Sequence, residues 1–282
     1  MPYISVIVPC YNQAQYLNEA LQSVLDQSYT DWECIIVNDG SPDNTREIAE
    51  KWNIKDSRFR YLEKENGGIS SARNAGIEIA NGKWILPLDA DDLIGKEYMV
   101  LAMKAIDENP NIGVLYANAT LFGEKSGPFE LFEYDFRRLL RLNMIYITAF
   151  FKKEDWVKVG GFDTNLIHGL EDWEFWINLI GNTKKEVLKI DYQGFYYRIK
   201  NVSRNQSIAK EEDKKRDINI YVLKKHIDLY IDTFGTYQNL LDMNDQLIYN
   251  NNVLMERIDK RERFLVMKIF RKLQSIYNKI FH

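Results

Sequence analysis

The sequence predicts an α/β protein with an open, mixed sheet flanked by helices, followed by a C-terminal helical extension. Over residues 4–116, short runs rich in β-branched residues alternate with segments of helical period. Three of these runs end in dense polar turns, as strands do in such sheets. Beyond Ser203 proline is absent and Gly235 is the remaining glycine, which favours long helices. We expect a folded domain over residues 1–204 and the extension over 205–282.

The composition excludes several classes of protein. A content of 45% hydrophobic and 28% charged residues is typical of a chain that buries a core. The net charge of -4 gives no general attraction for nucleic acid. Cys10 and Cys34 lie in apolar runs and the 3 histidines are scattered, so we expect a reduced, cytoplasmic setting and no histidine-built zinc site. We expect neither a signal peptide nor a membrane span, because the N-terminal segment has no basic and apolar leader pattern and no apolar run approaches ~20 residues.

The predicted elements follow a β-α-β-α-β-α-β order. Ile4–Val8 is a β-branched run that stops at Pro9, and Asn12 is expected to cap the helix that follows. This alternation predicts a sheet with helices on both faces. Further strands are predicted at 32–37, 59–62, 84–88 and near 114–116, further helices at 43–52, 70–80 and 96–107, and a mixed pattern at 123–200.

Polar clusters end three of the predicted strands: Pro9–Asn12, Asn38–Ser41 and Asp89–Asp92. Ligands of open α/β sheets bind outside the carboxyl ends of the strands, so we expect these clusters along one edge. Asp89 and Asp91 place two carboxylates on one side of an extended segment. Hard oxygen ligands of this kind suit Mg²⁺ or Mn²⁺ together with a phosphate. A solvated turn that caps the next helix is the alternative.

The segment Asn66–Asn74 carries Gly67 and Gly68 and enters a predicted helix. Backbone amides at such a helix start bind phosphate, and Arg73 adds a positive charge suited to a diphosphate. The spacing is that of neither a Walker loop nor Gly-x-Gly-x-x-Gly. A tight turn is the structural alternative.

Six segments resemble, in order, the motifs of glycosyltransferase family 2, whose members have the GT-A fold. The resemblance covers residues 1 to about 200 and implies a Rossmann-like nucleotide-sugar-binding half at 1–117 and an acceptor-binding half at 118–204. It also implies an inverting transfer from a sugar nucleotide, a UDP-sugar, with Mn²⁺ or Mg²⁺ as cofactor. The segments are Val6–Asn12, Val37–Thr45, Asn66–Asn74, Leu88–Asp92, Gly160–Asp163 and Leu170–Trp176.

Carried over motif by motif, the resemblance implies roles for individual residues. Asp39 is expected to hold the base or ribose, Arg73 to lie by the uridine or diphosphate, and Asp89 to contact the ribose. Asp91 is expected to ligate the metal, which neutralises the departing diphosphate as a Lewis acid. The full set expected at the nucleotide-sugar is Pro9, Tyr11, Asn12, Asp39, Gly68, Arg73, Asp89 and Ala90.

Asp172 is the general base that the resemblance implies. A base of this kind needs a pKa raised toward neutral, and the apolar Leu170, Trp173 and Trp176 are suited to raise it by desolvation. On the residues alone, Glu171-Asp172 equally fits a charged helix N-terminus.

Two departures from the family pattern are informative. The Gln-x-x-Arg-Trp motif of the processive members is absent from the sequence, so we expect transfer of a single sugar. Tyr196–Ser203 resembles a late block that often has histidine where Asn201 stands, which would reduce any role of that residue in holding metal or diphosphate. Residues expected near the acceptor or behind the base are Glu171, His168, Trp173, Arg198 and Asn201.

The C-terminal extension carries two patterns. Leu240, Leu247, Leu254 and Arg261 are seven residues apart, with Asn244, Asn251 and Ile258 between them. This imperfect heptad predicts a homodimer or, alternatively, a helix packed on its own domain. From residue 263 onward basic residues alternate with aromatic and aliphatic ones, without an acidic residue. That pattern predicts peripheral contact with the cytoplasmic face of a membrane, or a partner-binding helix.

Three functions are compatible with the fold that these motifs predict, to different degrees. The first is transfer of a sugar to a glycan or lipid-linked acceptor in cell-surface polysaccharide biosynthesis. The second is a nucleotidyltransferase that makes the sugar nucleotide, but its class favours a glycine-rich signature after the first strand, where this chain has Pro-Cys-Tyr-Asn. The third is a non-catalytic scaffold, which would be expected to lose Asp91 or Asp172.

Overall fold

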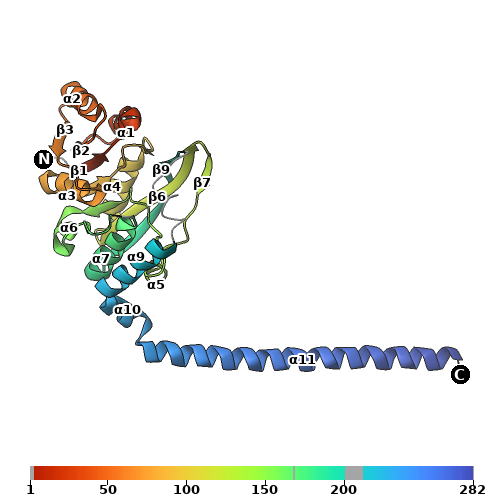
Figure 1. Cartoon of the computed structure of the whole chain (residues 1–282). Helices are drawn as coiled ribbons and strands as arrows, with labels where there is room; N and C mark the ends of the chain where they lie inside the picture. Colours follow the sequence, from red (N-terminus) through yellow and green to blue (C-terminus); the bar gives the residue numbers. More distant parts are fainter. Residues whose placement is uncertain (1–2, 168, 201–211, 282) are drawn as a thin grey trace. The chain divides into compact units, whose positions relative to one another are not determined.

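The structure, a computed structural model, describes residues 3–167, 169–200 and 212–281 (Figure 1). Contacts divide the chain into two compact units, Met1–Ile227 and Asp228–His282. Within the described residues no helix combines the length and apolar character that crossing a membrane requires.

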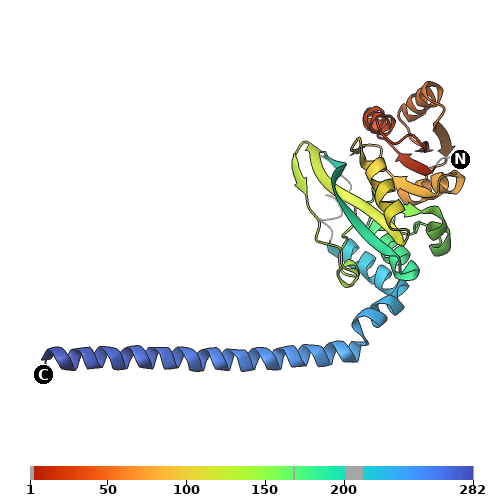
Figure 2. The same ribbon diagram turned by 180° about the vertical axis from the view of Figure 1, so that it is seen from behind.

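A single mixed sheet runs through the described part of the first unit, in the order β3-β2-β1-β4-β8-β6-β9-β5, with β7 beside β6. β1 to β4 are parallel, whereas β8 runs antiparallel to both of its neighbours. The long strands β6 and β9 pair in parallel and curve together (Figure 2). The strands are β1 Ile4–Cys10, β2 Trp32–Asp39, β3 Phe59–Lys64, β4 Trp84–Pro87, β5 Leu93–Ile94, β6 Ile112–Gly123, β7 Gly127–Phe129, β8 Phe150–Lys152 and β9 Glu186–Ile199.

Helices cover both faces of this sheet, which confirms the predicted α/β class. The even-numbered side chains of β1 and β2 join one apolar cluster with α1, α2 and α4. On the opposite face α3 packs on β1 and β2. The helices are α1 Ala14–Leu25, α2 Thr45–Lys55, α3 Ile69–Ile79, α4 Tyr98–Glu108, α5 Phe136–Leu139, α6 Lys153–Val159, α7 Glu171–Thr183, α9 Glu212–Lys225, α10 Ile227–Phe234 and α11 Tyr237–Phe281.

The first strand continues through Pro9, where the sequence predicted a stop. The Leu88 amide donates to the Ile7 carbonyl, so alternate backbone groups of β1 face β4. By Pro9 the strand β4 has already ended. The missing N–H of proline therefore leaves no ladder hydrogen bond unmade on that side.

The predicted cap of the first helix is wrong. Asn12 has a left-handed φ of 53°, and α1 begins only at Ala14. The Ala14 amide donates to the Asp43 carboxylate at 2.9 Å, and the same carboxylate accepts the Thr45 amide at 3.1 Å. Asp43 thus satisfies the first turns of both α1 and α2, which a local sequence pattern cannot reveal.

Helix α3 approaches the sheet closely at Gly76. A Cβ at this position would lie 2.6 Å from the Ile7 Cγ2 atom and 2.8 Å from the Val37 Cγ2 atom. The close approach matters because α3 also carries Arg73, so the packing at Gly76 sets the height of that side chain above the sheet.

Gly76→Ala is expected to lower the free energy of unfolding by about 1–2 kcal/mol, because overpacking outweighs the ~1 kcal/mol gain in helix propensity. Urea denaturation of the full chain measures the difference. Glu78→Ala, on the exposed side of the same helix, is the matched control and should change stability little. A Gly76→Ala variant as stable as wild type would show that the contact relaxes freely.

Candidate active site

A buried arginine joins the end of β4 to the start of α7. The Arg73 side chain is 2% exposed, and it donates to Asp89 Oδ1 at 2.8 Å and to Glu171 Oε1 at 3.0 Å. Burial alone would lower the pKa of Arg73, but the two carboxylates outweigh it and raise the pKa above its ordinary value. Asp89 and Glu171, about 80 positions apart in the sequence, are thereby held around one guanidinium.

Asp172 follows Glu171 in the first turn of α7. Its Oδ1 accepts the Trp173 amide at 2.8 Å, and its Oδ2 accepts the Asn143 side-chain amide at 2.8 Å. Burial is the largest cause that raises the pKa of Asp172 to about 6, followed by the charge of Glu171, whereas Arg73 and the hydrogen bonds oppose the shift. A carboxylate with this pKa is ionised at neutral pH and basic enough to accept a proton.

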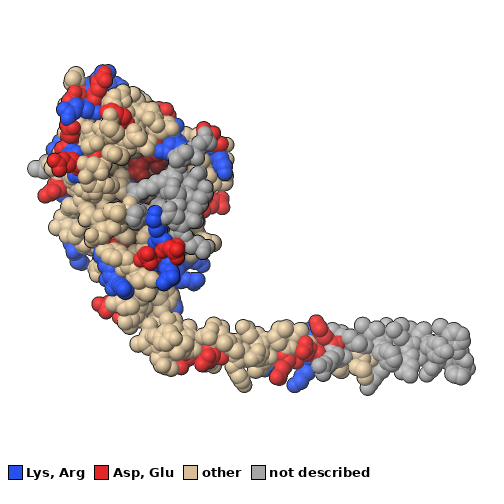
Figure 3. All heavy atoms as spheres, viewed as in Figure 1, with Lys and Arg blue, Asp and Glu red and all other residues tan. Residues whose placement is uncertain are grey.

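Three carboxylates gather after β4. Asp91 is partly exposed and forms an ion pair with Lys200. Asp92 is buried and accepts the Arg198 amide at 2.7 Å. Burial, and then the charges of Asp91 and Asp89, raise the pKa of Asp92 well above its ordinary value. On the face seen in Figure 3, acidic atoms are visible at the floor of a hollow.

This donor set fits a magnesium or manganese ion that shares its ligands with a phosphate. In the described part of the chain, no three His, Cys, Asp or Glu side chains form a ready-made metal site. The carboxylates of Asp89 and Asp91 are hard oxygen ligands, and Mg²⁺ is commonly held by one or two carboxylates plus substrate phosphates. Asp91 would be the protein ligand of such an ion.

Asp39 organises the glycine loop before α3. Its carboxylate accepts the Gly67 and Gly68 amides at 3.0 and 2.9 Å, and the Lys64 ammonium at 2.7 Å. A weaker contact comes from the Asn66 side chain at 3.3 Å. Gly68 has a left-handed φ of 83° and open space where a Cβ would stand. The Asp39 carboxylate, which is expected beside the nucleobase or ribose, is therefore already engaged in hydrogen bonds that shape the loop.

The end of β1 presents an aromatic ring to solvent. Tyr11 is 50% exposed, whereas Pro9 is buried in the strand. The Asn12 amide donates to Ser41 Oγ at 2.7 Å, so this segment is tied to the loop after β2. Ala90, by contrast, is buried beneath the aspartate cluster.

Trp173 and Arg198 contact groups of the unit itself, and their expected roles near the acceptor or behind the base stay predictions. Trp173 is buried, and its indole N–H donates to the Leu139 carbonyl at 2.6 Å, so it packs inside the unit. Arg198 donates to the Asp91 carbonyl at 2.7 Å and to Glu19 at 2.8 Å, so it holds the aspartate loop. Glu171 precedes Asp172 and forms an ion pair with Arg73, which is compatible with its expected place behind the general base. His168 and Asn201 lie outside the described residues.

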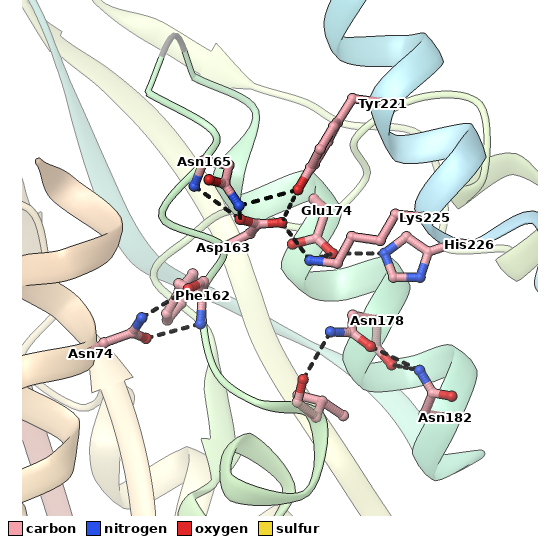
Figure 4. A network of polar contacts seen from close by, with 11 residues as sticks. Asn74, Phe162, Asp163, Asn165, Glu174, Asn178, Asn182, Tyr221, Lys225 and His226 are labelled. Atoms are coloured by element: carbon pink, nitrogen blue, oxygen red, sulfur yellow. Dashed lines mark hydrogen bonds and ion pairs between the residues drawn. The ribbon is translucent and has the colours of Figure 1, made fainter.

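A second ionic network secures the chain just before α7 (Figure 4). Lys225 of α9 pairs with both Asp163 and Glu174, and His226 contacts the same Glu174 oxygen at 2.6 Å. Burial alone would raise the pKa of Asp163, but hydrogen bonds from Lys225, the Asn165 amide and other donors lower it to about 2. The end of α9 therefore holds the chain on both sides of Asp172, at Asp163 and at Glu174.

Sequence reasoning missed Lys200, Asn143 and Lys225. For Lys200 a signal existed, because alternation along an extended strand puts it on the same side as Arg198. Asn143 lies in an irregular segment, and Lys225 is one basic residue among many in a polar helix. Neither had a local pattern that could have identified it.

Comparison with known proteins gives one family. Residues 5–161 match the family Glycosyl transferase family 2. Glycosyltransferase GlyA of Streptococcus pneumoniae serotype 4 is 39% identical over 45% of this chain, and the minor teichoic acid biosynthesis protein GgaB of Bacillus subtilis is 32% identical over 70%. The matches span only 18% and 23% of those two proteins.

Among solved structures, the chain resembles S. aureus TarS 1-349 in complex with UDP-GlcNAc. The TM-score is 0.64 at 26% identity, over 73% of this chain and 61% of that one. This likeness agrees with the mixed sheet and the flanking helices described above.

The raised pKa of Asp172 predicts a pH-dependent stability. Between its ordinary pKa of 3.8 and about 6, the carboxyl ionises in the unfolded chain but keeps its proton in the folded one, so stability falls as pH rises. Asp172→Asn removes this contribution. Its free energy of unfolding relative to wild type should increase from about pH 4 to pH 7, measured by urea denaturation. If the free energies of unfolding of the two proteins changed in parallel with pH, the raised pKa of Asp172 would be contradicted.

Proposed function

This chain belongs to glycosyl transferase family 2, and we propose that it transfers a single sugar from a UDP-sugar to a hydroxyl of a glycan or lipid-linked acceptor. Its relatives support this class of reaction, since GgaB is a teichoic acid biosynthesis protein and TarS was crystallised with UDP-GlcNAc. A role in cell-surface polysaccharide biosynthesis follows as part of the proposal.

One observation carries the proposal furthest: Arg73 holds Asp89 and Glu171 on either side of a single guanidinium. Asp89 opens the acidic segment suited to the donor and its metal. Glu171 immediately precedes the carboxylate with the raised pKa. The two halves of a glycosyl transfer, departure of a diphosphate and removal of a proton, thus have suitable groups on either side of Arg73.

On the donor side, the exposed ring of Tyr11 and the open backbone at Gly68 are suited to a nucleotide. The Asp39 carboxylate would contact a nucleobase only by giving up one of the hydrogen bonds that it accepts from the glycine loop. A divalent cation on Asp91, when bound, supplies Lewis-acid stabilisation of the diphosphate charge. Arg73 contributes positive charge to the same region.

On the acceptor side, the hydroxyl oxygen attacks the anomeric carbon and its proton passes to the Asp172 carboxylate. The bond between that carbon and the diphosphate oxygen breaks, and its electron pair leaves with the diphosphate. A single displacement of this kind inverts the anomeric centre. The pKa of about 6 at Asp172 is matched to this task.

The alternatives fit the molecule less well. A nucleotidyltransferase would be expected to cradle a triphosphate in a glycine-rich loop after β1, but this chain has Pro-Cys-Tyr-Asn there. A non-catalytic scaffold would be expected to lose Asp91 or Asp172. Both Asp91 and Asp172 are present.

Asp172→Asn is expected to lower kcat by at least about 10²-fold while leaving UDP binding in the presence of Mn²⁺ intact, because only the proton acceptor is lost. Asp91→Ala should instead weaken metal-dependent UDP binding. Release of UDP from a panel of UDP-sugars measures turnover, and calorimetry measures binding. Unchanged turnover in Asp172→Asn would remove that residue from the base role, and absence of UDP binding to wild type with Mn²⁺ would overturn the proposed donor.

We also propose that α11 pairs with α11 of a second copy. Leu240, Leu247 and Leu254 are exposed along one stripe of the helix, with Asn244 and Asn251 at the alternate heptad positions. Leucine and asparagine in this arrangement favour a parallel pair, since asparagines facing each other set the register. Peripheral membrane contact and a cytoplasmic location stay predictions, because most side chains of the basic segment beyond 263 lie outside the described residues.

Sedimentation of the full chain should give the mass of a dimer. Replacing Leu247 and Leu254 by lysine should convert it to the single-chain mass, because like charges would then face each other in the seam. Gln246→Lys, which adds a charge on the opposite side of the helix, should leave the dimer intact. A wild-type chain that sediments as a monomer at all concentrations would contradict the pairing.

A further inference from the structure

The ammonium of Lys200 is paired with the carboxylate of Asp91, the residue that is expected to bind the metal. Lys200 follows the last residue of β9 and forms an ion pair with Asp91 Oδ2. Both side chains are largely shielded, at 19% and 20% exposure. The ammonium also donates to Gln13 Oε1 at 3.0 Å. It therefore links the aspartate loop after β4 to the loop between β1 and α1.

The surrounding charges explain why a cation is needed at this point. Asp89, Asp91 and Asp92 lie within four residues, and like charges this close are unfavourable unless they are neutralised. Arg73 pairs with Asp89. Arg198 reaches the backbone carbonyl of Asp91, and its charge is paired with Glu19. Among the described residues, Lys200 is the cation paired with the Asp91 carboxylate.

The position of the ammonium is also suited to a donor. Gln13 directly follows Tyr11 and Asn12, two residues expected to border the nucleotide. The Tyr16 ring lies 5.3 Å from the Lys200 ammonium. A diphosphate that shares a metal ion with Asp91 would lie within reach of a lysine side chain whose flexible stem carries three N–H donors.

Building on the proposed function, we infer that Lys200 is a built-in counter-cation that yields Asp91 to the divalent cation and then pairs with the diphosphate of the donor. A divalent ion and an ammonium on the same carboxylate would repel each other, so Lys200 would give up Asp91 when such an ion is bound. Its ammonium would then pair with the negative charge of the donor. No covalent bond is made or broken in this exchange.

The exchange has a thermodynamic consequence. A metal ion that arrives alone must break the Lys200–Asp91 pair, so it binds weakly. A nucleotide diphosphate that is present at the same time gives the displaced ammonium a new partner. Lys200 therefore makes metal and nucleotide binding cooperative, and by linkage each ligand strengthens the other by the same factor.

The test compares Lys200→Met with wild type and with Lys189→Met, which replaces an exposed lysine of β9. Free Mn²⁺ is followed by electron paramagnetic resonance without nucleotide, and UDP binding by calorimetry with saturating Mn²⁺. Lys200→Met should bind Mn²⁺ alone about threefold more tightly, since Asp91 is freed, and should bind UDP about tenfold more weakly, since a charge-assisted contact is lost. Lys189→Met should match wild type in both.

Lys200→Gln provides a second neutral variant, and thermal unfolding of each variant establishes that it is folded. Lys200→Arg keeps the charge and should retain most of the UDP affinity. If both neutral variants bind Mn²⁺ and UDP as wild type does, the inference is overturned. If wild type itself fails to bind UDP with Mn²⁺, the proposed donor fails, whereas the displacement of Lys200 is still tested by Mn²⁺ binding alone.

Discussion

The site depends on the burial of one arginine. A guanidinium taken out of water needs carboxylate partners for its charge, and removing one partner of a buried pair typically costs about 3–5 kcal/mol. Arg73 has two such partners, Asp89 at the end of a strand and Glu171 at the start of a helix, whereas its Nε–H has no hydrogen-bond partner among the described residues. The rigid fork of arginine, with donors in fixed directions, holds these two elements in one geometry. The aspartate segment after β4 and the start of α7 are thereby held next to one another.

The charges around Arg73 and its two carboxylates are not balanced. Acidic groups outnumber the cations that touch them after β4, and burial raises the pKa of Asp92 and of Asp172. Lys200 supplies an ammonium on a flexible stem, whereas Arg73 supplies a rigid guanidinium. Such a site favours ligands that bring both a divalent cation and an anionic phosphate, because each compensates the charge that the other leaves.

Two aspartates serve the same site from a distance by shaping backbone. Asp39 accepts the amides of Gly67 and Gly68, and Asp43 accepts the amides of Ala14 and Thr45. For Asp43, burial opposes the negative charge, but hydrogen bonds from Ser41 and Thr45 hold its pKa below the ordinary value. Hydrogen bonds to the Asp39 and Asp43 carboxylates thus hold the loops at the strand ends in shape.

The sequence by itself determined the α/β class, the order of its first elements and the set of polar strand ends, because apolar period and turn residues are local properties. It also identified Arg73, Asp91 and Asp172 as residues to expect at one site, through the family resemblance. Only the tertiary structure decided which groups touch. It buried Trp173, turned Arg198 onto the Asp91 carbonyl and brought Lys200 to the Asp91 carboxylate. These contacts join residues about 35 to 110 positions apart, and since loop closure and packing set them, no local pattern encodes them.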